Sequence, residues 1–252
     1  MENGTLCHAC AGTGWKTIEV EGIRSVTRCE CFQKERLDRL FDKAGVPRRY
    51  EACSFESLKS FDAISESLSF TKTVAMRFAE EYPAVECGLL IMGPCGVGKT
   101  HLAVSILREL IYKKQAEGLF YDFRDLLKKI QNSYNTVSQS SEVEILDPVL
   151  NCDVLVLDDL GAERPTEWVR DTFAYIINSR YNRKLTTVIT TNFDDRKKEA
   201  KVLADGARVS GEETLEERIG TRLRSRLYEM CKVLRIEGSD FRVSVQQAHY
   251  RF

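Results

Sequence analysis

The amino-acid sequence predicts an α/β fold, a parallel sheet flanked by helices, preceded by a small zinc-ribbon-like module. The main observation is Gly93-Pro94-Cys95-Gly96-Val97-Gly98-Lys99-Thr100, which matches the phosphate-binding pattern G-x-x-x-x-G-K-[ST]. It follows an apolar run of strand length, 88–92, and precedes apolar residues at helical spacing, 102–111. A second apolar run, 153–159, is typical of a strand buried on both faces of a parallel sheet.

The composition is that of an ordinary globular protein. With 252 residues, the chain is long enough for one sizeable α/β domain and a small appendage. Its 37 Lys and Arg nearly balance 38 Asp and Glu, so any surface that binds nucleic acid must be local. Because no apolar run approaches membrane-spanning length and the first residues lack signal-peptide features, we expect no membrane association and a cytoplasmic location.

Cysteines near the N-terminus predict a metal-binding module over residues 1–44. Strand-like segments, 15–20 and 25–28, separate a C-x-x-C pair from a C-x-C pair. A hairpin with two thiolates at each end is a zinc-ribbon arrangement. The expected Zn²⁺ ligands are Cys7, Cys10, Cys29 and Cys31. His8 is a possible substitute ligand, and the alternative is a set of reduced thiols without metal.

The elements that follow are bounded by glycine and proline. An amphipathic helix, 32–44, is expected to stop at Gly45, where we place the start of the second domain, 45–252. Tyr50 and Phe55 are either adenine-pocket or core residues. The next expected elements are a helix, a strand, a basic helix and a polar loop, at 68–82, 119–123, 124–134 and 136–144.

Beyond the second apolar run we expect a helix with Trp168 and Phe173 on its buried face. A β-branched strand, 185–191, then leads to Asn192. The remaining expected elements are a loop or weak helix, one continuous helix carrying an arginine stripe, and two short strands, at 194–213, 212–228 and 233–245.

The polar residues at the strand ends suggest phosphate chemistry. Loop N–H groups and the helix dipole favour phosphate, and Lys99 is expected to reach the β- and γ-phosphates. Thr100 and Asp158 are expected to hold Mg²⁺, and Asp159 to orient or activate the attacking water. Asn192 would position that water or touch the γ-phosphate. The alternatives are that the aspartates cap a turn and that Asn192 is a turn residue. The expected nucleotide contacts are Gly93 to Thr100, His101 and Asp158.

Four stretches resemble the bacterial DnaC/DnaI helicase loaders and the similar IstB transposition ATPases, within the AAA+ ATPases. They are Gly45 to Tyr50, Leu157 to Gly161, Thr191-Asn192, and Arg222 to Cys231. The resemblance covers about residues 45–252. The order of Lys99, Asp158, Asn192 and Arg226 is similar to the family's succession of Walker A, Walker B, sensor 1 and arginine helix.

This resemblance implies a five-stranded parallel sheet, ATP with Mg²⁺, ATP hydrolysis, and self-association into a ring or spiral. The family's arginine finger falls on Arg226, with Arg222 as second choice. Many members have Glu where this chain has Asp159, which implies slow hydrolysis. Arg242 stands where it can replace a missing lid arginine.

Three functions remain open from the sequence. The first is a helicase loader whose N-terminal module docks on a replicative DNA helicase and whose ATPase domain binds single-stranded DNA. The DNA contacts would be basic and aromatic residues, Arg124, Lys128, Lys129 and Tyr134, which could also be ordinary surface. The second is an IstB-like transposition helper, and the third is a nucleotide-dependent binding switch with little hydrolysis.

Overall fold

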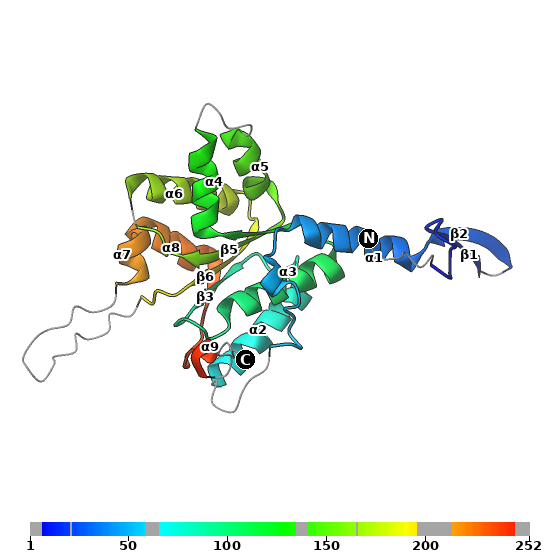
Figure 1. Ribbon diagram of the computed structural model, residues 1–252, viewed down its shortest axis with the longest axis horizontal. Helices are drawn as coiled ribbons and strands as arrows, with labels where there is room; N and C mark the ends of the chain where they lie inside the picture. The colour runs from blue at the N-terminus through cyan, green and yellow to red at the C-terminus, as the bar shows by residue number, and fades with distance from the viewer. Residues whose placement is uncertain are drawn as a thin grey trace, which may run out of the picture.

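The computed structural model describes residues 7–20, 22–58, 66–134, 141–164, 166–195 and 213–244. Its centre is a five-stranded sheet of order β4-β5-β6-β3-β7 in which every neighbouring pair is parallel, as predicted (Figure 1). The strands are β3 Gly88–Met92, β4 Gly118–Asp122, β5 Val154–Leu160, β6 Thr186–Thr191 and β7 Cys231–Arg235. Parallel strands bring their carboxyl ends to one edge, so the polar residues that end β4, β5 and β6 lie together.

Helices cover both faces of the sheet. Alternate strand residues point to opposite sides, so Leu89 and Ile91 belong to one core and Leu90 and Met92 to the other. The first face is covered by α1 Glu30–Lys43, α2 Glu66–Glu81 and α3 Lys99–Lys114. The second is covered by α4 Phe123–Ser133, α5 Glu142–Asn151, α6 Glu167–Asn182, α7 Leu215–Ile219 and α8 Thr221–Met230. Within the described residues, no helix is long and apolar enough to cross a membrane.

The N-terminal hairpin lies at the far end of α1, away from the sheet (Figure 1). It pairs β1 Trp15–Val20 with β2 Ile23–Arg28 in antiparallel fashion, as expected. The opposite end of α1 packs on α3, where the rings of Phe41 and Tyr112 are 5.8 Å apart. Phe41 and Ala44 are part of the first core, so α1 joins the hairpin to the sheet domain. A domain boundary at residue 45 stays a prediction.

Two expectations for the C-terminal part were wrong. The predicted continuous helix 212–228 is two helices, because Gly220, with φ +85° and ψ 152°, breaks it between α7 and α8. Of the two strands predicted over 233–245, the first is β7, whereas Phe241–Ser244 forms the short helix α9. Most of the predicted loop or weak helix 194–213 lies outside the described residues.

Two further differences concern helix starts. Helix α5 was not predicted, and it includes Glu142 to Glu144, which we expected in a polar loop. Its first turn is stabilised by a capping box between Ser141 and Glu144. Phe123, expected to end a strand, begins α4, because the Asp122 carboxylate accepts hydrogen bonds from the N–H groups of Arg124 and Asp125.

Arg180 is a fully buried charged residue that connects α6 with α5 and β6. Its guanidinium donates to the carbonyl oxygens of Val149 (2.9 Å), Cys152 (2.9 Å) and Thr186 (2.7 Å). It also donates to the Thr187 hydroxyl at 3.0 Å. The cation therefore satisfies carbonyl groups at the end of α5, where the helix dipole is negative.

We expect Arg180→Ala to lower the free energy of unfolding by about 3 kcal/mol or more, because several buried acceptors lose their donor at about 1–3 kcal/mol each. Arg183→Ala, at an exposed position at the end of the same helix, serves as the control and should change it by less than about 0.5 kcal/mol. Urea unfolding of both variants measures the difference. Equal losses would contradict the role assigned to Arg180.

Candidate nucleotide site

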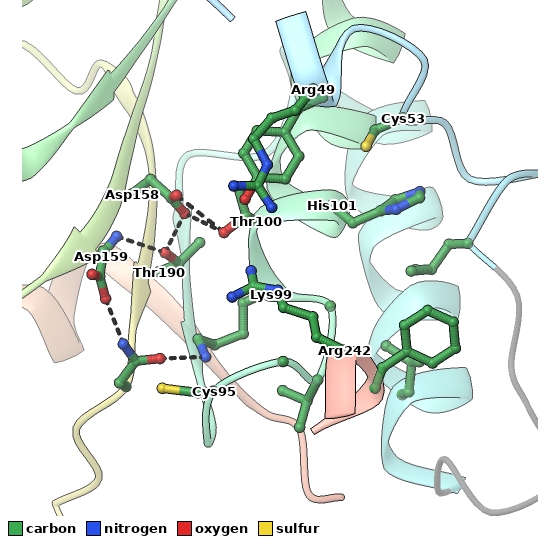
Figure 2. A pocket seen from close by; sticks show the side chains of 18 of the residues that line it. Arg49, Cys53, Cys95, Lys99, Thr100, His101, Asp158, Asp159, Thr190 and Arg242 are labelled. Atoms are coloured by element: carbon green, nitrogen blue, oxygen red, sulfur yellow. Dashed lines mark hydrogen bonds between the residues drawn. The ribbon is translucent and has the colours of Figure 1, made fainter. Parts of the chain in front are cut away.

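The phosphate-binding pattern forms the connection between β3 and α3, beneath a cavity of about 850 Å³ (Figure 2). Other parts of the chain can pack closely against this loop where it has glycine, which carries no side chain. A Cβ added at Gly96, whose φ is +76°, would lie 1.8 Å from Oδ1 of Asp240. Bare loop N–H groups at a helix N-terminus are suited to phosphate oxygens, and the cavity volume is in the range of small-molecule sites, roughly 300–1,000 Å³.

The cavity collects polar residues from the carboxyl ends of three strands and from α3. These are Lys99, Thr100, Asp122, Asp158, Asp159, Thr190 and Asn192. All five residues whose side chains the sequence assigns to phosphate, magnesium or water chemistry are among them. Of the expected loop contacts, Cys95 to Thr100 line the cavity, and Gly93 and Pro94 do not. Asp122 was missed, although its place at the end of a parallel strand could have identified it.

Lys99 is buried beneath the cavity, and three oxygens accept its hydrogens. Nζ donates to the carbonyl oxygens of Gly93 (2.9 Å) and Pro94 (2.6 Å) and to Oδ1 of Asn192 (2.7 Å). Burial lowers the pKa of Lys99. The ammonium is held by neutral groups that a phosphate oxygen can replace.

Asp158 is a buried carboxylate at the end of β5 whose donors are hydroxyl groups. Thr190 donates to Oδ1 at 2.6 Å, and the Thr100 hydroxyl lies 3.0 Å from both carboxylate oxygens. No salt bridge to Asp158 occurs within the described residues. Burial raises its pKa, as expected for a carboxylate without a cation. The oxygens of Thr100 and Asp158 are the ligand type that Mg²⁺ prefers, so the pair fits this ion.

Asp159 adopts a left-handed backbone conformation, with φ +58°, which is uncommon outside glycine. Its N–H donates to the Thr190 hydroxyl at 2.9 Å, and Oδ1 accepts a hydrogen bond from Nδ2 of Asn192 at 2.6 Å. Burial raises the pKa of Asp159, and the charge of Asp122 adds to the effect. Asn192 thus bridges Lys99 and Asp159. Its amide oxygen accepts a hydrogen bond from the lysine ammonium, and its amide nitrogen donates one to the aspartate carboxylate.

His101 lines the cavity but has a second role that the sequence did not indicate. Its Nε2 lies 3.0 Å from the carbonyl oxygen of Ser54 and 3.0 Å from the Ser57 hydroxyl, so it fixes the segment before α2. Burial lowers the pKa of His101. Phe55 belongs to the core, whereas Tyr50 both lines the cavity and packs against the core, so its role at an adenine pocket stays a prediction.

The predicted arginine-finger residues do not line the cavity of their own chain. Arg226 donates to Oδ1 of Asn178 and lies 5.0 Å from the ring centre of Tyr181. Arg222 is exposed on the same helix. Two other arginines do reach the cavity. They are Arg242, whose role in place of a lid arginine stays a prediction, and Arg49, which was not singled out.

The four N-terminal cysteines form one cluster whose sulfur atoms all lie within 4.8 Å of one another: Cys7, Cys10, Cys29 and Cys31. The Sγ atoms of Cys10 and Cys31 are 3.4 Å apart, and those of Cys7 and Cys29 are 3.8 Å apart. Tetrahedral Zn²⁺ with bonds of about 2.3 Å places its sulfurs about 3.8 Å apart, so the cluster fits this ion. Desolvation opposes ionisation of Cys10, but hydrogen bonds from Cys31 and nearby backbone lower its pKa to about 6. His8 is exposed and lies outside the cluster.

The proposed DNA-contacting residues all lie on α4 or just after it. Arg124 is engaged with Glu163 (3.4 Å) and with the carbonyl oxygen of Ala162 (3.1 Å). Lys128 and Lys129 are exposed. Tyr134 is 54% exposed, and its hydroxyl donates to Glu142 at 2.7 Å. Lys129 also lies over the Tyr121 ring, 5.0 Å from its centre. The exposed Tyr134 ring can stack on a base while its hydroxyl keeps Glu142, whereas Arg124 would have to exchange partners.

Comparison with known proteins identifies the family. The sequence matches IstB-like ATP binding protein over residues 57–248. The chain belongs to this family. Its membership confirms the resemblance drawn from the Walker motifs and the arginine helix.

Individual relatives of this IstB-like chain include the replicative helicase loader DnaC of Escherichia coli K12, 25% identical over 184 residues, with 71% of this chain and 73% of the relative covered. Phage-like element PBSX protein XkdC of Bacillus subtilis 168 is 21% identical over 252 residues, with 97% and 84% covered. A crystal structure of the DnaC helicase loader has a TM-score of 0.61 at 33% identity, covering 75% of this chain and 99% of that one. The DnaI structure has a TM-score of 0.58 at 28% identity, with 78% and 94% covered.

The buried Asp158 carboxylate predicts a pH-dependent stability of the nucleotide-free protein. Because the pKa of Asp158 is higher in the folded than in the unfolded state, its neutral form favours folding. This contribution to the free energy of unfolding is fully present below the unfolded pKa of about 4 and is lost as the pH rises through the folded-state pKa. We expect Asp158→Asn to melt above the wild type at about pH 8, with a smaller difference at about pH 4. Asp171→Asn, exposed on α6, is the control. Thermal scans at both pH values test this, and a pH-independent difference would contradict it.

Proposed function

We propose that the chain is an ATP-hydrolysing helicase loader of the DnaC/DnaI kind. The observation that carries the proposal is the convergence of Lys99, Asp158 and Asn192 on one cavity above the glycine loop, in a chain of the IstB-like ATP binding family. The loader role is supported by relatives named replicative helicase loader DnaC and by the 33% identity to the DnaC structure.

ATP would occupy the cavity with its phosphates on the loop from Gly93 to Thr100. Lys99 would exchange the carbonyls of Gly93 and Pro94 for β- and γ-phosphate oxygens. Thr100 and Asp158 would hold Mg²⁺, which when bound supplies neutralisation of the phosphate charge. Turning Lys99 toward phosphate also releases the oxygen of Asn192.

Asp159 and Asn192 would handle the attacking water. The Asp159 carboxylate can accept a hydrogen bond from the water and so orient it. The amide nitrogen of Asn192, which lies 2.6 Å from that carboxylate, can donate to the water or to the γ-phosphate. The aspartate side chain is one methylene shorter than the glutamate common in AAA+ members. We therefore propose slow hydrolysis.

Arg226 is proposed to complete the site of a neighbouring subunit in a ring or spiral. Neither Arg226 nor Arg222 lines the cavity of its own chain, so an arginine finger from this helix would have to act in trans. To reach a partner's γ-phosphate, Arg226 must exchange Asn178 and the Tyr181 ring for the nucleotide. Arg222, which is exposed, is the second choice.

The N-terminal module and helix α4 would contact the two partners, the replicative helicase and single-stranded DNA. We propose that residues 1–44 bind Zn²⁺ through the four-cysteine cluster and dock on the replicative helicase. Residues 45–252 would form the ATPase domain. Single-stranded DNA would bind near α4 through Lys128, Lys129 and Tyr134, by phosphate contacts and base stacking.

We expect ATP with Mg²⁺ to raise the melting temperature of the wild type, because binding to the native state adds about 2.7 kcal/mol at 100 times the Kd. Lys99→Ala should lose both this shift and ATP turnover, since it removes the phosphate-binding ammonium. Lys113→Ala, a surface change further along α3, should retain both. If Lys99→Ala behaves like Lys113→Ala, nucleotide binding at this cavity is disproved.

Partner capture distinguishes the loader from the two other functions. With ATP present, the wild type should co-elute with the host's replicative helicase, and Lys99→Ala should not. Capture of a transposase instead would support the IstB-like helper role. Turnover that stays at background with DNA and helicase added would support a binding switch.

We expect about one equivalent of zinc in the purified protein, since four thiolates at this spacing form a closed structural site. The double variant Cys7→Ser, Cys10→Ser should lose the metal, whereas Cys87→Ser, outside the cluster, should keep it. Elemental analysis gives the content. Less than half an equivalent in the wild type, unchanged in the double variant, would rule zinc out.

A further inference from the structure

A second arginine enters the cavity from the segment that follows α1. Arg49 belongs to the short 3-10 helix η1, Arg48–Tyr50, and lines the cavity together with Tyr50. In Figure 2 its guanidinium points into the cavity from the top of the view, on the side of Thr100 and Asp158, whereas Arg242 enters from the lower right. In the sequence, Arg49 lies near the start of the segment 45–252 and Arg242 lies near its end.

Among the residues that the structure describes, Arg49 forms no ion pair, although carboxylates line the same cavity. Within the described parts of the chain, its guanidinium has one recorded contact, with the ring of its neighbour Tyr50 at 4.9 Å from the centroid. The carboxylates of Asp158 and Asp159 are occupied by the threonine hydroxyls and by Asn192. A cation with five donors therefore faces the cavity with no anionic partner in the described part of the chain.

The backbone that carries Arg49 is held in place. The N–H of Tyr50 donates to the carbonyl of Pro47 at 2.8 Å, and Arg108 of α3 donates to the carbonyl of Glu51 at 2.7 Å. His101, also on α3, binds the carbonyl of Ser54. The arginine is therefore mounted on a segment attached to the helix that begins with Lys99, which limits the entropy lost when its side chain binds a ligand.

We propose that Arg49 binds the polyphosphate of the nucleotide in cis, on the Thr100 and Asp158 side of the cavity. The nature of the ligand rests on the proposed function. A guanidinium matches phosphate oxygens bidentately and stays charged when desolvated. Thr100 and Asp158 would hold the metal that neutralises the triphosphate charge, and Arg49 enters the cavity beside these two residues. We therefore place Arg49 where it favours the triphosphate over the diphosphate.

The test compares Arg49→Ala with Arg48→Ala in the full chain. Arg48 is the adjacent residue of the same short helix, is exposed and does not line the cavity. The Kd for ATP and for ADP, with Mg²⁺, is measured by calorimetric titration. Arg49→Ala should weaken ATP binding by about ten-fold, the effect of one lost charged hydrogen bond, and ADP binding by less. Arg49→Lys should fall between, and Arg48→Ala should stay within about two-fold of the wild type.

The outcomes separate this inference from the proposed function. If Arg49→Ala binds ATP as tightly as Arg48→Ala while Lys99→Ala does not bind, the role of Arg49 is refuted and the ATPase remains. Equal losses for ATP and ADP also refute it, because the side chain would then not distinguish the triphosphate. A wild-type chain that binds no ATP refutes the proposed function itself. Nucleotide-free melting temperatures of the two alanine variants should agree, since both positions are exposed.

Discussion

The arrangement of the site depends on the burial of one carboxylate, Asp158, which has no cationic partner among the described residues. Burying an unpaired charge is costly, and here the cost is reduced by hydroxyl donors from two other elements, Thr100 of α3 and Thr190 of β6. The same Thr190 hydroxyl accepts the N–H of Asp159, which fixes the left-handed turn that directs that residue into the cavity. The carboxylate therefore stabilises the relative positions of loop, strand end and neighbouring strand, while its raised pKa keeps the nucleotide-free fold below its attainable stability.

A continuous set of contacts leads from this carboxylate to the arginine helix. Asn192 binds Lys99 and Asp159, and the residue after it, Phe193, lies against the Arg218 guanidinium, 4.6 Å from the ring centre. Two residues further on, Asp195 accepts a hydrogen bond from Arg224 of α8 at 2.8 Å. The segment that follows β6 thus places the Asn192 amide beside Asp159 and also contacts α8, the helix that carries Arg226.

Much of the site could be predicted because its signals are local. The glycine loop, the run ending in Asp158 and the strand before Asn192 are contiguous patterns, and parallel topology then brings them to one edge. Arg49 could not be predicted, because an arginine in a short connection has no periodicity that shows where its side chain points. The break at Gly220 was missed because the apolar spacing continues across it. In α5 the polar residues before and within its first turn hid the S-x-x-E capping signal of Ser141 and Glu144.

Helix α3 relates the cysteine module to the nucleotide site. It begins with Lys99 at the cavity and is about 24 Å long, from 16 residues at about 1.5 Å each. Near its other end the Tyr112 hydroxyl donates to Asp38 of α1 at 2.7 Å, so α1 and its hairpin are oriented by a rigid element that is itself anchored at the phosphate loop. The connection from α1 back to the cavity passes through η1, whose Arg49 has no anionic partner among the described residues. Two elements therefore connect the cysteine module with the cavity. Helix α3 is held by packing, whereas η1 carries Arg49, a side chain whose contacts an anionic ligand in the cavity can change.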